Sequence, residues 1–250
     1  MPLLSSTLQW LRFCSAFGAL AVALGALAWH EQQLQFLPAV HLGPWEIGRQ
    51  PLVIVDAGHG GHDGGAVANG VVEKQLSLKL AHQLRRHLER LGLNVRMTRE
   101  QDRFLELEER CQIAGQMQAA AFVSVHLNTN PDTSIRGLET YFAGTGLLSR
   151  PASLAARTAA DSPGETLARR VQRHAVAATG AEDRGIKPSQ LVVVVRTPCP
   201  AVLVECGFLT HAEEVRQLQQ EAYQEQLTQG IAAGVAEFLQ ARPTMPPRRH

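Results

Sequence analysis

The sequence predicts an α/β fold: a single domain with a mostly parallel central sheet of about six strands and helices on both faces, preceded by an N-terminal hydrophobic leader. Three observations predict it. The chain has 250 residues, 45% of them hydrophobic, which is enough to bury one substantial core. Beyond residue 50, short apolar runs alternate with helical patterns. A strand, a helix and a second strand in succession imply a parallel pair.

The first 30 residues are predicted to be an export signal or a membrane anchor. Residues 13–29 carry no charge, Arg12 supplies positive charge on their inner flank, and Ala26 to Ala28 match a small-residue cleavage site. The apolar run is near the lower length limit for spanning a bilayer, so an uncleaved anchor in the inner membrane stays open beside a cleaved signal. Either interpretation places the rest of the chain outside the cytoplasm, in the periplasm or cell envelope.

The rest of the chain divides into a linker, a domain and a tail. Residues 31–50, with two prolines and little periodicity, form the predicted linker. Residues 51–241 form the predicted domain. Residues 242–250 contain three prolines and three arginines and are predicted to be a frayed tail.

Within the domain, strands are predicted from short apolar runs and helices from apolar residues at helical spacing. The predicted strands cover residues 52–55, 95–98, 121–126, 138–142, 191–195 and 201–205. The predicted helices are one with a face formed by Leu76, Leu80, Leu84, Leu88 and Leu91, then residues 105–117 and 165–178, and one or two helices over 212–240. The run 138–142 alternates in polarity, which predicts a half-exposed strand. Residues 144–164, rich in Gly, Ser, Ala and Pro, are predicted to be a loop or a short helix.

Charge and cysteine usage argue against two classes of protein. The formal net charge is +1 without long like-charge blocks, so the sequence predicts no basic face and no nucleic-acid partner. Of the four cysteines, Cys14 lies in the leader, which leaves an odd number in the domain. A disulfide framework is therefore not expected, and Cys199 and Cys206 are predicted to be small buried apolar residues.

Three of the predicted strands end at or near a residue that can serve zinc chemistry. The first strand leads to His59, the third ends at His126 and the last ends at Glu205, while Glu73 lies in the first turn of the long helix. The carboxyl ends of parallel strands converge on a crevice, so these side chains are expected to meet. Two imidazoles and two carboxylates supply three ligands for Zn²⁺, an open position for water and a spare carboxylate as base.

Each of these residues also has a simpler explanation, which for His126 is that of a hydrogen-bonded structural histidine at a strand end. The glycine-rich loop around His59 could cradle a phosphate, but it lacks the Lys-Ser/Thr ending of a P-loop and the spacing of the dinucleotide fingerprint. An acid such as Glu73 is favoured at a helix start by the helix dipole alone. Glu205 follows four apolar residues and needs compensation, either from a zinc-bound water or from a partner such as Arg184 or Arg196.

Neighbouring residues give weaker hypotheses. Asp56 could orient a ligand histidine, although a turn-stabilising role is at least as favoured. Cys206 could be a nucleophile, but adjacent strand residues point to opposite faces, so Cys206 is expected to face the core if Glu205 faces the site. The histidines expected to be solvent-facing or structural are His62, His82, His87, His174 and His211.

Five motifs between about Val53 and Leu239 resemble those of one known family. They are Val55-Asp56-Ala57-Gly58-His59-Gly60-Gly61 with Asp63 and Gly65-Ala66, Glu73-Lys74, Ser124-Val125-His126 with Asn128, Asp183-Arg184-Gly185, and Val204-Glu205-Cys206-Gly207-Phe208-Leu209. The family is that of the zinc-dependent N-acetylmuramoyl-L-alanine amidases of bacterial cell-wall turnover and division, in the AmiC-type branch.

The resemblance implies a site, a substrate and a reaction. His59, Glu73 and His126 would hold Zn²⁺, and Glu205 would be the catalytic carboxylate. The reaction would be hydrolysis of the amide that joins the lactyl group of N-acetylmuramic acid to the first L-alanine of the peptidoglycan stem peptide. Glu205 would take the proton of the attacking water and return it to the departing alanine nitrogen.

Two other functions and one regulatory question stay open. A zinc carboxypeptidase or peptidase acting on stem peptides would use the same residues, and a non-catalytic wall-binding or regulatory protein is the alternative from another class. Some family members need a protein activator that removes a blocking helix, and residues 144–164 are short for such a helix. The need for an activator and the oligomeric state are therefore left undecided.

Overall fold

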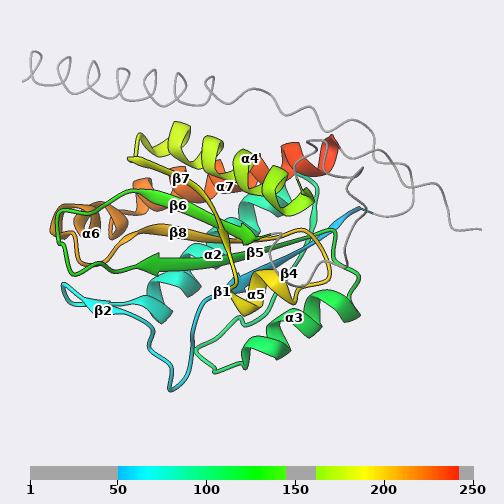
Figure 1. The fold of residues 1–250 in the computed structure, drawn as a ribbon, viewed down its shortest axis with the longest axis horizontal. Coiled ribbons are helices and arrows are strands. Elements are labelled where there is room, and N and C mark those ends of the chain that lie inside the picture. The colour runs from blue at the N-terminus through cyan, green and yellow to red at the C-terminus, as the bar shows by residue number, and fades with distance from the viewer. Residues whose placement is uncertain (1–49, 145–161, 242–250) are drawn as a thin grey trace, which may run out of the picture. The chain divides into compact units, whose positions relative to one another are not determined.

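A computed structural model describes residues 50–144 and 162–241 of the chain (Figure 1). Its strands are β1 (Leu52–Ala57), β2 (Val67–Ala68), β3 (Val71–Val72), β4 (Asn94–Met97), β5 (Ala121–Asn128), β6 (Leu138–Ala143), β7 (Asp183–Ser189) and β8 (Ala201–Phe208). Its helices are α2 (Glu73–Arg90), α3 (Leu107–Gln116), α4 (Pro163–Thr179), α5 (Val192–Val195), α6 (Ala212–Leu218) and α7 (Glu221–Gln240). Over these two ranges, no helix has the length and apolar character needed to cross a bilayer. The predicted leader, tail, linker before residue 50 and loop at 145–161 lie outside the described residues.

The main sheet has six strands in the order β4-β1-β5-β8-β6-β7. The first four of these strands are parallel, whereas β6 runs antiparallel to β8 and β7 runs parallel to β6. The prediction of a mostly parallel sheet of about six strands is confirmed. This topology brings the carboxyl ends of β1, β5 and β8 and the amino end of β6 to the same edge of the sheet, here called the site edge.

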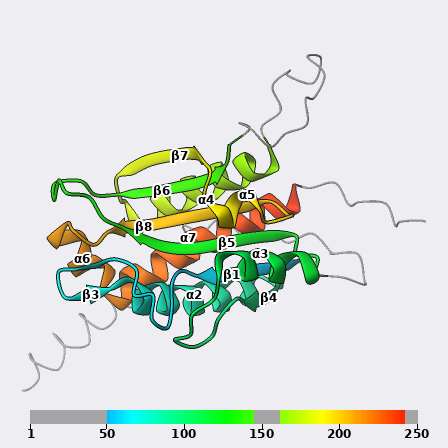
Figure 2. The same ribbon diagram turned by 60° about the horizontal axis from the view of Figure 1, so that its bottom comes forward.

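Helices cover both faces of this sheet, as predicted (Figures 1 and 2). On one face, α2, α4 and α7 pack against one another and against the strands. On the other face lie α3 and α5, where Phe122 and Leu203 pack with Ala114 of α3 and Val193 of α5. Side chains four residues beyond Phe122 and two residues beyond Leu203 point to this same face. The predicted site residues of β5 and β8 therefore lie on the α3–α5 face, at the site edge.

The helix α2 forms where the leucine spacing predicts it. Leu76, Leu80, Leu84 and Leu88 are all buried, with one such residue every four positions along a helix face. The helix begins with Glu73 itself and ends before Gly92, which has a φ of 78° that favours glycine. Its first turn therefore delivers the Glu73 carboxylate to the site edge.

Three predicted elements differ in the structure. Residues 191–195 are not a strand, because residues 192–195 form the short helix α5, whose Val193 and Val194 are buried on the sheet. Periodicity cannot distinguish a buried strand from a buried helical turn in so short an apolar run. The sixth strand is instead β7, whose polar sequence Asp-Arg-Gly-Ile-Lys-Pro-Ser carries no apolar signal and whose proline is tolerated at a sheet edge. Finally, β6 is mostly buried rather than half-exposed, because α4 packs on one of its faces and α5 on the other.

Candidate metal centre

The loop after β1 carries His59 in a conformation that neighbouring glycines permit. His59 has a φ of 61°, in the left-handed region that few residues other than glycine adopt. A Cβ at Gly58 would lie 2.4 Å from the His126 ring, and a Cβ at Gly65 would lie 2.5 Å from the His59 ring. The absence of side chains at these two positions therefore lets the loop pass directly against the predicted ligands.

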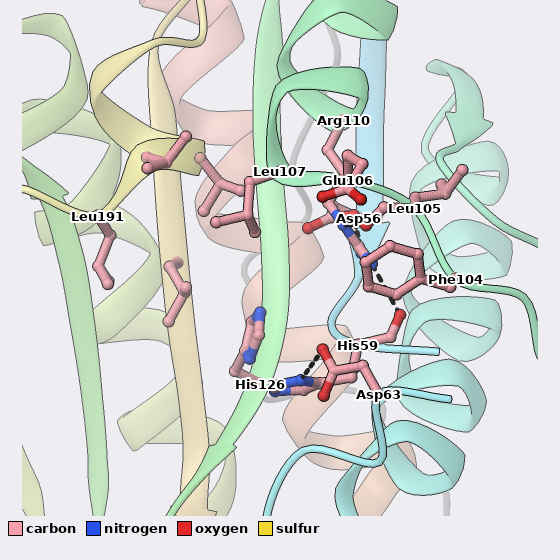
Figure 3. Close-up of a pocket in the computed structure, with 13 residues that line it drawn as sticks. Asp56, His59, Asp63, Phe104, Leu105, Glu106, Leu107, Arg110, His126 and Leu191 are labelled. Carbon is pink, nitrogen blue, oxygen red and sulfur yellow. Dashed lines mark hydrogen bonds and ion pairs between the residues drawn. The ribbon is translucent and has the colours of Figure 1, made fainter. Parts of the chain in front are cut away.

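Asp63 fixes the orientation of the His59 ring (Figure 3). The His59 Nδ1 atom lies 2.8 Å from Asp63 Oδ2, and the other carboxylate oxygen of Asp63 accepts a hydrogen bond from the Gly65 amide at 3.0 Å. A proton on Nδ1 leaves the Nε2 lone pair of His59 free to face the site. Burial disfavours protonation of His59, but its contacts with Glu73 and Asp63 outweigh burial and raise the pKa of the ring.

The Glu73 carboxylate lies between the two histidines. Its Oε1 atom is 3.1 Å from His59 Nε2 and 2.9 Å from His126 Nδ1. Backbone amides hold the same carboxylate, since Ala66 N donates to Oε2 at 2.8 Å and Leu127 N donates to Oε1 at 3.0 Å. Burial opposes ionisation, but the hydrogen bonds from the histidines and the Ala66 amide prevail, and the pKa of Glu73 lies well below its usual range.

Together these three side chains form a ligand cluster suited to a metal ion. One ligand atom each from His59, Glu73 and His126 lies within 4.8 Å of the others. Two imidazole nitrogens and one carboxylate oxygen match a hydrolytic zinc site with an open fourth position. Because Glu73 is oriented by backbone amides and His59 by Asp63, the donor set is held in place by the fold. The residues present therefore fit Zn²⁺.

Glu205 stands beside this cluster on the neighbouring strand. In the pairing of β5 with β8, His126 is directly opposite Glu205, so both side chains project from the same face. Glu205 Oε2 is buried and has no hydrogen-bond partner. Burial raises the pKa of Glu205 to about 7, which the positive charge of a protonated His126 partly offsets and the nearby Glu73 reinforces.

The two arginines considered as structural partners of Glu205 are bound elsewhere. Arg184 Nε donates to Glu139 at 3.0 Å, and Arg196 pairs with Glu108. The explanation of Glu205 by a structural ion pair is therefore wrong. A buried carboxylate oxygen without a partner, next to a zinc-type ligand cluster, fits a group that handles a proton during a reaction.

Asp56 does not orient a ligand histidine. Its carboxylate accepts hydrogen bonds from Thr98 Oγ1 at 2.6 Å, Ser124 Oγ at 2.6 Å and Arg110 Nη1 at 2.8 Å. Arg110, itself buried, also donates to the carbonyl oxygen of His59 at 2.8 Å. Asp56 thus joins β1 to β5 and α3 and holds the arginine that fixes the His59 backbone. Its contribution to the site is indirect, and it does not stabilise a turn.

The cysteines and the remaining histidines lie outside the site chemistry. Cys206 is a fully buried free thiol whose pKa is strongly raised by burial, which confirms that it faces the core opposite Glu205. Cys199 is half-buried rather than buried. The other histidines match their predicted roles in that His62 is exposed and packs on Phe104, while His211 caps α6 by accepting a hydrogen bond from Glu214 N.

A cleft of about 440 Å³ between α3 and α5 leads to His59 and His126 (Figure 3). Its walls are mainly apolar, with Phe104, Leu107 and Leu191 among the lining residues. Leu107 and Leu191 are 48% and 41% exposed at the mouth of this cleft. His59 and His126 line one end of the cleft, whereas Glu205 lies outside its lining. An apolar channel thus approaches the ligand cluster from the side of α3.

A sequence profile of a protein family, described as N-acetylmuramoyl-L-alanine amidase, matches residues 53–237 of the chain. This chain belongs to the N-acetylmuramoyl-L-alanine amidase family. The match covers well over half of the chain and contains all four predicted site residues. The family resemblance and the enzyme class predicted from the sequence are confirmed.

Individual amidases agree with this assignment. LytC of Bacillus subtilis (strain 168) is 33% identical over 186 residues, which make up 74% of this chain but only 35% of LytC. The solved catalytic domain of CwlV from Bacillus (Paenibacillus) polymyxa var. colistinus is 34% identical, has a TM-score of 0.68, and is covered over 100% of its length by 77% of this chain. CwlD from Clostridioides difficile, solved in complex with the GerS lipoprotein, is 27% identical with a TM-score of 0.67, and 76% of this chain covers 98% of it. The chain thus spans about a third of LytC but a whole amidase catalytic domain.

Sequence reasoning missed two residues of this region. Asp63 was part of the recognised motif, but its contact with His59 depends on the left-handed loop backbone, which spacing alone does not reveal. Glu139 is 2% exposed and pairs directly with Glu205 across β6 and β8. Its position on a strand predicted to be half-exposed hid its burial, and the available signal was an acid within the apolar run 138–142.

Proposed function

We propose that this amidase-family member is a zinc-dependent hydrolase of the amide bond between N-acetylmuramic acid and L-alanine in peptidoglycan. His59, Glu73 and His126 would hold the zinc ion, and Glu205 would be the catalytic carboxylate. The observation that carries the proposal is the ligand cluster beside a buried carboxylate oxygen that has no partner. Family membership supplies the scissile bond.

The chain's own residues divide the chemistry between them. A bound zinc ion would polarise the scissile carbonyl and stabilise negative charge on its oxygen. Glu205 takes a proton from the attacking water and then donates it to the alanine nitrogen as the amide bond breaks. Burial raises the pKa of Glu205 in the metal-free protein to about 7, and a raised pKa suits a carboxylate that must both accept and donate a proton.

A zinc carboxypeptidase or peptidase acting on stem peptides is the alternative, and it would use the same four residues. The family assignment favours the amide at the lactyl group. A non-catalytic wall-binding protein is disfavoured because the ligand cluster and the unpaired carboxylate are both present. The reaction products distinguish an amidase from a carboxypeptidase, since an amidase releases stem peptides that begin with L-alanine.

We also propose an exported location and a protein partner. Peptidoglycan lies outside the cytoplasm, and the uncharged run at residues 13–29 supports export to the periplasm or cell envelope, with attachment to the inner membrane if the leader is retained. The complex of CwlD with the GerS lipoprotein supports a protein activator for this chain as well. Fractionation with and without high salt and detergent would locate the chain in the envelope.

The deciding experiment is digestion of purified peptidoglycan with the zinc-loaded protein, followed by mass spectrometry of the soluble products. We expect intact stem peptides with a free L-alanine amino group, lost after chelation and restored by added zinc. Release of single amino acids would instead establish a carboxypeptidase. Absence of any product, with zinc bound and the protein folded, would contradict an enzyme that acts without an activator.

A further inference from the structure

A row of charged and polar side chains runs from the ligand cluster across the neighbouring strands of the sheet. His126 on β5 pairs with Glu205 on β8, and Glu205 pairs in turn with Glu139 on β6. Side chains directly opposite one another on neighbouring strands share a face. Glu139 is therefore the next group along the site edge, and the next described strand beyond it is the edge strand β7.

Glu139 holds two cations from β7 at the border of the site. Its Oε2 atom accepts hydrogen bonds from Arg184 Nε at 3.0 Å and from Lys187 Nζ. Its Oε1 atom accepts from Tyr141 Oη at 2.6 Å and Asn128 Nδ2 at 2.8 Å. The carboxylate is 3% exposed, and burial is outweighed by these donors, so the pKa of Glu139 is lowered and the group is a fixed anion.

The two cations have hydrogen-bonding capacity to spare. An ammonium group has three donors and a guanidinium group has five, while Glu139 takes one from each. The side chains of Lys187 and Arg184 are 37% and 23% exposed, and their partner is not. Arg184 Nη1 is 3.9 Å from Glu182, which is 52% exposed and also pairs with Arg136. Because Glu182 balances Arg136, the two cations Lys187 and Arg184 on the single carboxylate of Glu139 leave one positive charge in excess at this border.

The chemistry of the substrate indicates which side of the scissile bond lies over this border. The muramic acid carboxyl is consumed in the amide, so the glycan side carries no carboxylate, whereas the peptide side can. On the opposite side of the site, the apolar cleft is lined by the exposed Glu106, which would repel an acidic peptide, and by Asp63, whose carboxylate is half-exposed and pairs with His59. An acidic peptide is therefore favoured over β6 and β7.

We propose that Lys187 and Arg184 form a subsite for a carboxylate on the stem-peptide residue that follows the L-alanine. The proposal rests on the amidase function proposed above and deepens it by assigning the direction of the substrate. Neighbouring strands are about 4.8 Å apart, so Glu139 lies about one strand spacing beyond Glu205. An extended peptide advances at most about 3.6 Å per residue, which places a carboxylate one residue beyond alanine at this distance.

The test uses two synthetic substrates that differ in one charge. Both are N-acetylmuramoyl-L-alanyl-D-glutamate with the γ-carboxyl blocked as the methylamide, and the α-carboxyl is free in one and amidated in the other. The wild-type enzyme should prefer the free acid through a KM that is about tenfold lower, the value of one charge-assisted hydrogen bond. Lys187→Met and Arg184→Met should each lose this preference, while Lys187→Arg retains it.

The ratio of kcat/KM between the two substrates is the readout, because the fraction of folded enzyme cancels within each variant. Arg136→Met is the matched control, since Arg136 is 53% exposed and pairs with Glu182 rather than Glu139, and its ratio should equal the wild-type ratio. A purely structural role for Lys187 and Arg184 would slow both substrates equally and overturn the proposal. Wild-type cleavage of both substrates without preference would also overturn it while leaving the amidase function intact. Failure to cleave either substrate, with zinc bound, would contradict an amidase that acts without an activator and would overturn this subsite with it.

Discussion

Glu73 and Glu205 are two carboxylates of one site that the fold treats in opposite ways. Glu73 receives two backbone amides and lies against both histidines, and its pKa is lowered. Glu205 has a buried oxygen without a partner, and its pKa is raised to about 7. The comparison teaches that satisfied hydrogen bonds keep a carboxylate charged, as the proposed metal ligand requires, whereas a carboxylate without them binds a proton more readily, as the proposed base requires.

Replacing Glu73 tests the ligand half of the comparison and should have the largest effect. Glu73→Ala removes the central ligand and leaves two histidines, so we expect loss of bound zinc and of all amidase activity. Metal analysis after dialysis and activity on peptidoglycan measure both. Glu214→Gln is the matched control, because Glu214 is another buried carboxylate that binds backbone amides, those of Gly137 and Phe208, away from the ligand cluster. Loss of zinc in both variants would indicate general unfolding rather than loss of a ligand.

Replacing Glu205 tests the other half of the comparison, the role of an unpaired carboxylate as proton acceptor. Glu205→Gln keeps the size of the side chain and removes its ability to accept a proton, so kcat should fall by about 10²–10⁴. Zinc content should be unchanged, because Glu205 lies outside the ligand cluster. Single-turnover kinetics and metal analysis on the same preparation provide the measurement. If Glu205→Gln lost zinc while activity per bound zinc stayed normal, its assignment as the base would be wrong.

Asp63 sharpens the comparison, because it does not belong to the ligand cluster but orients one of its members, His59, by a hydrogen bond. Asp63→Asn should weaken zinc binding by about 10–100-fold, since the charge that holds the Nδ1 proton of His59 is lost. Competition with a chelator of known affinity gives the value. Asp102→Asn serves as the control, because Asp102 anchors the same loop through Lys74 and the Gly61 amide without touching His59. Equal weakening in both variants would assign the effect to loop disorder.

The sequence predicted where the four proposed site residues lie more completely than it predicted their surroundings. His59, Glu73, His126 and Glu205 stand at the ends of apolar strands or the start of a regular helix, where local pattern determines position. The role assigned to Asp56 was wrong because its partner, Arg110, is 54 residues away in sequence.

The fold shows the same division between local pattern and tertiary context. The α2 leucines are predictable from spacing alone. By contrast, β7 has a polar sequence that pairs only because β6 offers it an edge, and the short α5 packs its valines on a sheet instead of joining it. Glu139 is buried only once β7 is in place, so no local rule could predict its contact with Lys187.

An effect on stability rather than on activity follows from the cost of keeping Glu205 unsatisfied. The pKa of Glu205 in the fold is about 7 against 4.5 for an ordinary glutamate, so the folded protein binds its proton more tightly than the unfolded chain does. Stability of the metal-free protein should therefore fall as the pH rises from 4.5 to 7, by up to about 3 kcal/mol from this group. A glutamine side chain cannot ionise, so the Glu205→Gln variant should gain stability over the wild type across that range.

The raised pKa of His59 gives a slope of the same sign, but that slope is present in both proteins and cancels in the difference. Denaturant unfolding of both metal-free proteins at pH 5 and pH 8 measures the difference. A difference that does not change with pH would mean that solvent reaches the Glu205 carboxylate, and the contrast with Glu73 would then rest on the ligand half alone.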